Sequence, residues 1–162
     1  MEVAIQLAKS LGEFRTRIVF AESCTGGLVS AELTGIPGIS EWFCGSSVTY
    51  RCATKTAWLG VSEKVIETKT AVSDIVASQM ASGVLRRTPE AGLACSITGH
   101  LGPSAPEGFD GLVYIGTARR QQDGECVKVI EHRLQTRGRS DRQREAAELV
   151  MRTALRALSD FS

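Results

Sequence analysis

Apolar residues recur along this chain with two different periods, and their alternation outlines the fold. Spacings of three and four residues place Val3, Leu7 and Leu11 on one face of a helix. Similar spacing and capping signals predict helices at 2–12, 25–34, 53–61, 71–87 and 140–161. Short apolar runs predict strands at 17–21, 43–50 and 92–98, and a later hairpin of 112–118 and 126–134.

Strands that alternate with helices indicate an α/β domain with helices on both faces of the sheet. The late hairpin makes that sheet mixed. A length of 162 residues without an interdomain linker suits one domain over 1–162. In such sheets ligands bind beyond the carboxyl ends of strands, and the loops at 22–27, 50–55 and 99–111 occupy such positions.

The first of these loops, "ESCTGG", contains reactive side chains between a strand and a helix. Ser23 at a helix start would be surrounded by backbone N–H groups that can bind an anion or an oxyanion. Gly26 and Gly27 would allow close approach of a ligand. The alternative is an ordinary turn capped by Ser23 or Thr25. Cys24 is a second possible nucleophile, although cysteine is more often a small buried apolar residue.

A serine nucleophile requires a base, and local pattern leaves several candidates. His100 lies in the glycine-rich loop, whereas His132 lies in a strand pattern. Lys55 follows a strand end, and a desolvated lysine can accept a proton near neutral pH. A solvated surface lysine is the usual alternative. Since "SCTG" lacks the S-x-x-K spacing, any pairing of Ser23 with Lys55 must come from the fold.

The loop "TGHLGPSAPEGFDG" has the composition of a ligand flap, although glycine and proline also favour plain surface turns. It contains no phosphate-binding GxxxxGK[ST] motif. Metal-ligand spacings are missing from the chain, so no metal or other cofactor is expected. The pattern favours a solvated helix entrance, although one arginine there could reach a substrate phosphate: Arg137, Arg139, Arg142 or Arg144.

Composition narrows the partners and the compartment. Lys and Arg total 19 against 18 Asp and Glu, so neither nucleic acid nor a membrane surface is expected as a partner. Five scattered cysteines without a CxxC motif suit a reducing compartment. The first residues include Glu2, Lys9 and Glu13, unlike a signal peptide. A cytoplasmic location is therefore expected.

The segments "AESCTGGLVSAELTGIPGIS", "VTYRCATKTAWLGV", "AVSDIVASQMASG" and "GLVYIG" together resemble the CinA C-terminal-domain family. The resemblance runs in order over most of the chain. It implies a three-layer α/β/α sandwich with a mixed, mainly parallel sheet, often dimeric, so a homo-oligomer is expected. It also implies metal-free hydrolysis of the carboxamide of nicotinamide mononucleotide, a small-molecule nucleotide, to nicotinate mononucleotide and ammonia, within pyridine-nucleotide salvage.

Family roles transfer to matching positions by resemblance. Ser23 matches the nucleophile, Lys55 its base, and Tyr50 a tyrosine that lines the site and supports proton transfer. The substrate-binding matches are Thr25, Gly26, Gly27, Thr98, Gly99, Gly102, Pro103 and Arg139, with Arg137 and Arg142 as alternatives to the last.

Departures from the family pattern fall in the loops that contact substrate. Arg51 and Cys52 replace a small hydroxyl residue and an asparagine, and His100 replaces an apolar residue. The 99–111 loop is about two residues shorter than the loop of the family pattern and lacks its glycine triplet. Because altered contacts of this kind change affinity, the substrate is less determined than the amidase chemistry. Two alternatives stay open: a catalytically silent relative that binds a nucleotide or a protein, and an amidase for another small amide.

Overall fold

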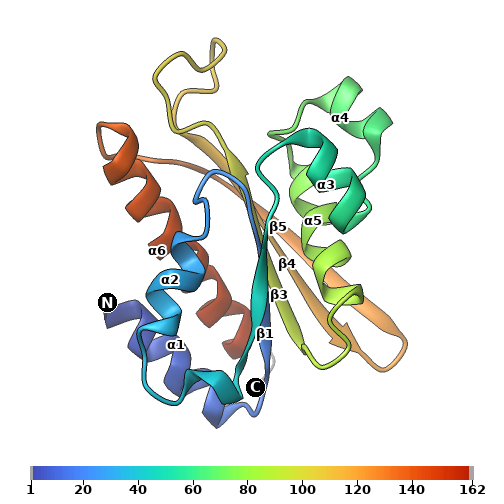
Figure 1. The fold of residues 1–162 in the computed structure, drawn as a ribbon, viewed down its shortest axis with the longest axis vertical. Helices are drawn as coiled ribbons and strands as arrows, with labels where there is room; N and C mark the ends of the chain where they lie inside the picture. Colours follow the sequence, from blue (N-terminus) through green and yellow to red (C-terminus); the bar gives the residue numbers. More distant parts are fainter. Residues whose placement is uncertain (1, 161–162) are drawn as a thin grey trace.

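A five-stranded mixed sheet forms the centre of the computed structural model, which describes residues 2–160 (Figure 1). The strand order is β2-β1-β3-β4-β5. The strands are β1 (Ile18–Glu22), β2 (Phe43–Val48), β3 (Leu93–Gly99), β4 (Leu112–Gln121) and β5 (Gly124–Arg133). Neighbours β2, β1 and β3 are parallel, and β4 is antiparallel to both β3 and β5. Only β4 therefore opposes the common direction, which confirms the predicted mixed, mainly parallel sheet.

Helices cover both faces of this sheet (Figure 1). One layer holds α1 (Glu2–Glu13), α2 (Leu28–Thr34) and α6 (Arg139–Ser159), and the other holds α3 (Cys52–Leu59), α4 (Glu63–Lys69) and α5 (Asp74–Arg86). A short 3-10 helix, η1, spans Ile39–Glu41. The α/β class and the three layers predicted from the sequence are thereby confirmed.

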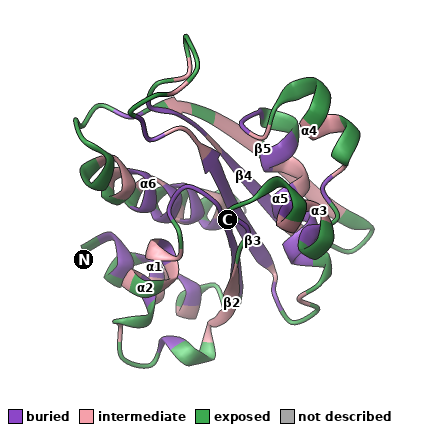
Figure 2. Ribbon diagram, turned by 45° about the horizontal axis from the view of Figure 1, so that its top comes forward, coloured by how far each residue is buried: buried purple, intermediate pink, exposed green. Residues whose placement is uncertain are grey.

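Strand β1 shows why its sequence is apolar throughout. Ile18 and Phe20 pack into the core beneath α1, α2 and α6, whereas Val19 and Ala21 face the core beneath α5. Every residue of the strand is buried, and the central strands are buried along most of their length (Figure 2). A strand covered on both faces has no need of polar alternation.

Local signals fix the helices that carry the site. Ser73 caps α5 by accepting a hydrogen bond from the Val76 amide, as predicted. Gly60 ends α3 in the left-handed region, with φ 73°, also as predicted. Gly83 lets α5 approach α3, because a Cβ there would lie 2.0 Å from the Leu59 carbonyl oxygen.

Several boundaries differ from those predicted. Helix α2 begins at Leu28 instead of at residue 25, because residues 23–27 form a separate turn. Helix α4 was not predicted. The hairpin strands extend to a two-residue turn at 122–123. Helix α6 begins at Arg139, one residue earlier than predicted, and the predicted end at residue 161 lies outside the described residues.

Strands β1, β2 and β3 all end at the same edge of the sheet, because they are parallel. The turn 23–27, the segment 49–51 and the loop 100–111 follow these ends (Figure 1). The three loops identified in the sequence are thus gathered at one edge. Among the described residues, no helix combines the length and apolarity needed to cross a lipid bilayer.

Candidate active site

Ser23 lies at the point where β1 leaves the sheet. Its amide still donates to the Ile97 carbonyl of β3 at 3.1 Å, so its backbone is held by the neighbouring strand. The following turn uses Gly26 and Gly27 at φ 63° and 100°, a conformation that other residues rarely adopt. Ser23 is buried and lines a cavity.

Lys55, from the first half of α3, reaches Ser23 through the interior. Its side chain is 1% exposed, and its Nζ lies 2.8 Å from Ser23 Oγ. The same nitrogen lies 2.7 Å from the Thr49 carbonyl oxygen and 3.4 Å from that of Tyr50. The structure therefore brings the predicted nucleophile and base into contact, across 32 residues of sequence.

The environment of Lys55 favours its neutral form. Burial lowers the pKa of the amine, because the charged form loses its hydration. Among the described residues, no carboxylate forms an ion pair with Lys55. A neutral amine has two hydrogens for the carbonyls of Thr49 and Tyr50, and its lone pair is then left for the hydroxyl of Ser23. This arrangement suits a base that removes the serine proton.

Cys24 lines the same cavity but suits the nucleophile role poorly. Its side chain is 5% exposed, and burial raises the pKa of its thiol to about 12. The thiolate, which is the reactive form, is thus scarce near neutral pH. Burial and the raised pKa disfavour Cys24, so Ser23 stays the predicted nucleophile.

The cavity above Ser23 has a volume of about 260 Å³ and mixes polar with apolar groups. Eight of the predicted site residues line it: Ser23, Tyr50, Lys55, Thr98, Gly99, Gly102, Pro103 and Arg139. Seven further residues complete the wall: Cys24, Ala71, Val72, His100, Leu101, Ser104 and Ala105. The roles assigned to these residues remain predictions, but the structure places them around one space.

Arg139 links two sides of the cavity. Its Nη2 donates to the hydroxyl of Tyr50 at 2.8 Å, and its Nη1 donates to the carbonyl of Gly102 at 2.7 Å. No ion pair to Arg139 occurs within residues 2–160, so its charge is available to an anion. Tyr50 contacts Lys55 through its backbone carbonyl, while its hydroxyl faces Arg139.

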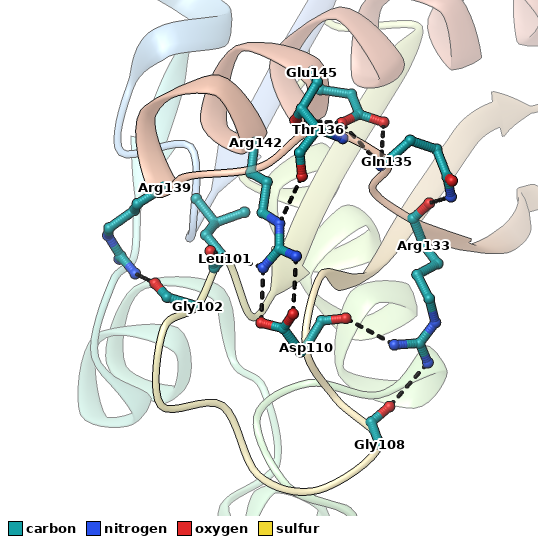
Figure 3. Close-up of polar contacts among 10 residues, drawn as sticks. All are labelled: Leu101, Gly102, Gly108, Asp110, Arg133, Gln135, Thr136, Arg139, Arg142 and Glu145. Atoms are coloured by element: carbon teal, nitrogen blue, oxygen red, sulfur yellow. Dashed lines mark hydrogen bonds and ion pairs between the residues drawn. The ribbon is translucent and has the colours of Figure 1, made fainter.

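Two further arginines hold the 99–111 loop in place (Figure 3). Arg142 donates to both carboxylate oxygens of Asp110, at 2.7 and 2.8 Å. Arg133 donates to the carbonyls of Asp110 and Gly108, at 2.7 and 2.9 Å. These bonds tie the loop to the rim of the cavity. Arg142 serves this rim, which leaves Arg139 as the arginine at the cavity.

The two histidines lie in different surroundings. His100 lines the cavity and packs edge-on against Phe109, with ring centroids 5.8 Å apart. Partial burial lowers the pKa of His100, which favours the neutral ring. His132 pairs with Val113 in the β4–β5 ladder and does not line the cavity. Among the described residues, no group of three or more His, Cys, Asp or Glu side chains is placed to hold a metal ion.

The predicted ligand contacts at Thr25, Gly26 and Gly27 are not part of the cavity wall. The Gly26 amide donates to the Ser23 carbonyl at 3.0 Å, and the Gly27 amide donates to the Glu22 carboxylate at 2.9 Å. The backbone amides of Gly26 and Gly27, just before the start of α2, therefore already have hydrogen-bond acceptors within the protein. Neither Ser23 nor Thr25 caps α2, because the Glu22 carboxylate does so.

Sequence reasoning overlooked Glu22. This residue ends β1 and is 1% exposed, although glutamate is almost never fully buried without partners. The available signal was an acid directly after the apolar run 18–21 and before a Gly-Gly turn. An acid at that position can satisfy the amides of the helix that follows.

Comparison with known proteins agrees with the fold. Residues 1–161 match the family model of the CinA C-terminal domain. A putative competence-damage inducible protein of Halothermothrix orenii is 43% identical over 117 residues, 70% of this chain and 28% of that protein. A CinA-like protein of Desulfosudis oleivorans is 39% identical over 155 residues, 94% of this chain and 36% of that protein. The chain thus spans about a third or less of the length of these relatives.

Solved structures match over nearly their whole length. The competence/damage inducible protein of Agrobacterium tumefaciens superposes with a TM-score of 0.88 at 32% identity, covering 98% of this chain and 94% of that one. A CinA superfamily protein of Klebsiella pneumoniae superposes with a TM-score of 0.90 at 25% identity, covering 98% and 97%. With the family model matched over 1–161, this chain belongs to the CinA C-terminal domain family.

Proposed function

We propose that this protein is a metal-independent amidohydrolase that deamidates nicotinamide mononucleotide, or a similar nucleotide amide, with Ser23 as nucleophile and Lys55 as base. The observation that carries the proposal is the 2.8 Å contact between Ser23 Oγ and a buried Lys55 Nζ. The substrate class follows from the family resemblance, and the geometry is compatible with it.

In the first step Ser23 Oγ attacks the carboxamide carbon while Lys55 Nζ takes the hydroxyl proton. The tetrahedral intermediate then collapses, the C–N bond breaks, and Lys55 returns the proton to the departing ammonia. In the second step a water molecule attacks the acyl carbon, again with Lys55 accepting its proton. The proton returns through Lys55 to the Ser23 oxygen, and the acid product leaves and releases its remaining proton to the solvent as it becomes the carboxylate.

The developing oxyanion needs donors close to Ser23. The amides of Gly26 and Gly27 are engaged by Ser23 and Glu22. Within residues 2–160, the amides of Cys24 and Thr25 donate no hydrogen bond to another residue. We assign the oxyanion to these two amides, in line with the frequent use of the residue after a nucleophile for this purpose.

Arg139 supports an anionic substrate. Its guanidinium is fixed by Tyr50 and Gly102 and lines the cavity without an internal carboxylate partner. Guanidinium groups bind phosphate with directed hydrogen bonds. The phosphate of a mononucleotide therefore fits at the Tyr50–Arg139 side, with the carboxamide directed toward Ser23.

The alternative of a silent nucleotide-binding relative draws on the same cavity. Cys52, which replaces the family asparagine, occupies the first position of α3 and is exposed. Lys55 nevertheless reaches Ser23 and Thr49 without help from residue 52. The catalytic pair is thus retained, which favours the enzyme over the silent relative.

The test compares ammonia release from nicotinamide mononucleotide by the wild type, Ser23→Ala and Lys55→Met. Each substitution should lower kcat by about 10³-fold or more, because each removes an essential member of the pair. Circular dichroism should show an unchanged fold, since methionine fits the site of a buried lysine. The Cys24→Ala variant is the matched control and should stay active. Full activity of Ser23→Ala or Lys55→Met would refute the mechanism. A wild type that is active only on other amides would show that nicotinamide mononucleotide is not the substrate.

A further inference from the structure

The carboxylate of Glu22 is enclosed by hydrogen-bond donors from the segment that carries Ser23. Its Oε2 accepts from the hydroxyl of Thr25 at 2.8 Å, from the amide of Gly27 at 2.9 Å and from that of Val29 at 3.1 Å. These contacts join the end of β1 to both the turn and the first turn of α2. The turn 23–27 thus closes around the side chain that precedes it.

The other oxygen of Glu22 reaches further. Its Oε1 accepts from the amide of Ser30 at 3.1 Å, from the hydroxyl of Ser30 at 2.6 Å and from the hydroxyl of Ser46 in β2 at 3.0 Å. One carboxylate therefore holds three segments together. Charge-assisted bonds of this kind are stronger than those between neutral groups.

The backbone of Glu22 extends the same connection to the base. The Glu22 carbonyl accepts from the amide of Thr49 at 2.8 Å, and the Thr49 carbonyl in turn lies 2.7 Å from Lys55 Nζ. Glu22 is also covalently next to Ser23. The nucleophile and the base are therefore both located relative to this one residue.

We propose that Glu22 is a positioning residue that fixes Ser23 Oγ against Lys55 Nζ, beyond its contribution to the stability of the fold. This inference rests on the proposed function. Small displacements of reacting groups are costly in catalysis. Loss of the carboxylate should therefore loosen the turn and reduce the rate of attack, while substrate binding at Arg139 is preserved.

The experiment compares Glu22→Gln and Thr25→Val with the wild type. Glutamine has nearly the same shape but presents an amide N–H to groups that are themselves donors. Valine removes only the hydroxyl bound to Glu22, so it tests the network if Glu22→Gln fails to fold. The control is Ser96→Ala, which removes a buried hydrogen bond of 2.6 Å to the Ala77 carbonyl, outside this network.

Two readouts are taken below each variant's melting temperature. The first is kcat and KM for ammonia release. The second is the rate at which a fluorophosphonate probe labels Ser23, which requires no knowledge of the substrate. We expect Glu22→Gln to lower kcat and labelling by about 10- to 100-fold, with KM changed less than about twofold. Thr25→Val should show a smaller decrease, and Ser96→Ala should match the wild type per folded molecule.

The outcomes separate this inference from the proposed function. A folded Glu22→Gln variant with wild-type kcat and labelling rate would overturn the positioning role. Equal losses of kcat and labelling rate in Ser96→Ala and Glu22→Gln would show that Glu22 contributes only to stability. That result would also overturn the positioning role. The wild type could be labelled by the probe yet release no ammonia, while Glu22→Gln is labelled slowly. That result would support the positioning role of Glu22 and reject nicotinamide mononucleotide as the substrate. A wild type that is neither labelled nor active would overturn both.

Discussion

Lys55 is the residue on which the proposed chemistry depends most, and its surroundings influence its charge. Transfer of an ammonium ion into the interior costs several kcal/mol unless an anion accompanies it. The groups around Nζ are instead the neutral oxygens of Ser23, Thr49 and Tyr50. These oxygens can accept hydrogen bonds from a cation formed during proton transfer, whereas burial favours the uncharged amine.

The pH dependence of activity should follow Lys55. Burial lowers its pKa, so we expect kcat/KM to rise with pH along a limb whose apparent pKa lies below the ordinary lysine value of 10.5. Stability should rise over the same range, because the unfolded chain binds more protons than the folded one between the two pKa values. Rate profiles, and denaturant titrations of the wild type against Lys55→Met, measure both effects.

In Lys55→Met this contribution to the pH dependence of stability should vanish. A limb centred at or above 10.5, or an unchanged stability profile in Lys55→Met, would contradict the lowered pKa of Lys55.

For single residues, the sequence predicted a role best where few structural roles explain a residue of that type at that position. A serine shortly before two glycines at the end of a strand suggested a nucleophile, and the structure places the predicted base, Lys55, 2.8 Å from its hydroxyl. Local pattern alone could not choose among Lys55, His100 and His132, because their pairing with Ser23 depends on tertiary structure. Glu22 was missed although five of its six donors lie three to eight residues after it, because only the folded turn directs them at one carboxylate.

At the scale of elements, the tied 99–111 loop is the distinctive part of the site. Arg142 at the start of α6 and Arg133 at the end of β5 both hold Asp110, so the loop is fastened to two elements (Figure 3). Gly102 fits this cluster because a Cβ at φ 66° would lie 2.6 Å from Asp110 Oδ1. The altered loop is thus specified by its own contacts, even though it departs from the family pattern.

Loosening this loop should affect substrate binding more than chemistry. We expect Asp110→Asn to raise KM severalfold with a smaller change in kcat. The loop forms part of the cavity wall, whereas Ser23 and Lys55 do not belong to the loop. The control is Arg152→Ala, which breaks an exposed pair with Glu148 on the same helix. Arg142 lowers the pKa of Asp110, so the pair persists above the ordinary carboxyl pKa and is lost as pH falls through the lowered value.

Steady-state kinetics at neutral pH measure the effect of Asp110→Asn. An unchanged KM in Asp110→Asn, or an equal rise in Arg152→Ala, would show that the tie does not shape the cavity.

The elements that were predicted well are those with a buried face. Helix α4 escaped prediction because it has no fully buried residue and therefore no strong apolar stripe. Ser62 caps its first turn, since its hydroxyl accepts a hydrogen bond from the Val65 amide. The amide of Ser62 donates in turn to the side chain of Gln79. The late start of α2 has a different cause, since its cap is supplied by a side chain that precedes the turn.

For the molecule as a whole, the site exists only through the assembly of the sheet. Ser23 belongs to the end of β1, Lys55 to α3 and Arg139 to α6, on opposite sides of the central layer. The parallel pairing of β1 with β2 and β3 brings these parts to one edge. Binding at this edge should therefore stabilise the entire fold.

Ligand-dependent unfolding tests the nucleotide site without turnover. For Ser23→Ala, nicotinamide mononucleotide at 100 times its Kd should add about 2.7 kcal/mol of stability and raise Tm by about 5–10 °C. The Arg139→Ala change in this background should remove most of the shift at the same concentration. The control is Arg144→Ala, since Arg144 pairs with Asp141 and does not line the cavity.

Nicotinamide riboside, which lacks the phosphate, should produce a small shift that is insensitive to Arg139. Equal shifts with and without Arg139 would place the phosphate elsewhere.

The reversed direction of β4 has a practical consequence. Because β4 leads away from the cavity edge, the two-residue turn at 122–123 lies at the opposite end of the sheet (Figure 1). Its neighbours are polar and exposed. A fluorescent tag or a tethering peptide inserted there would report on the molecule, or attach it to a surface, while the cavity still faces the solution.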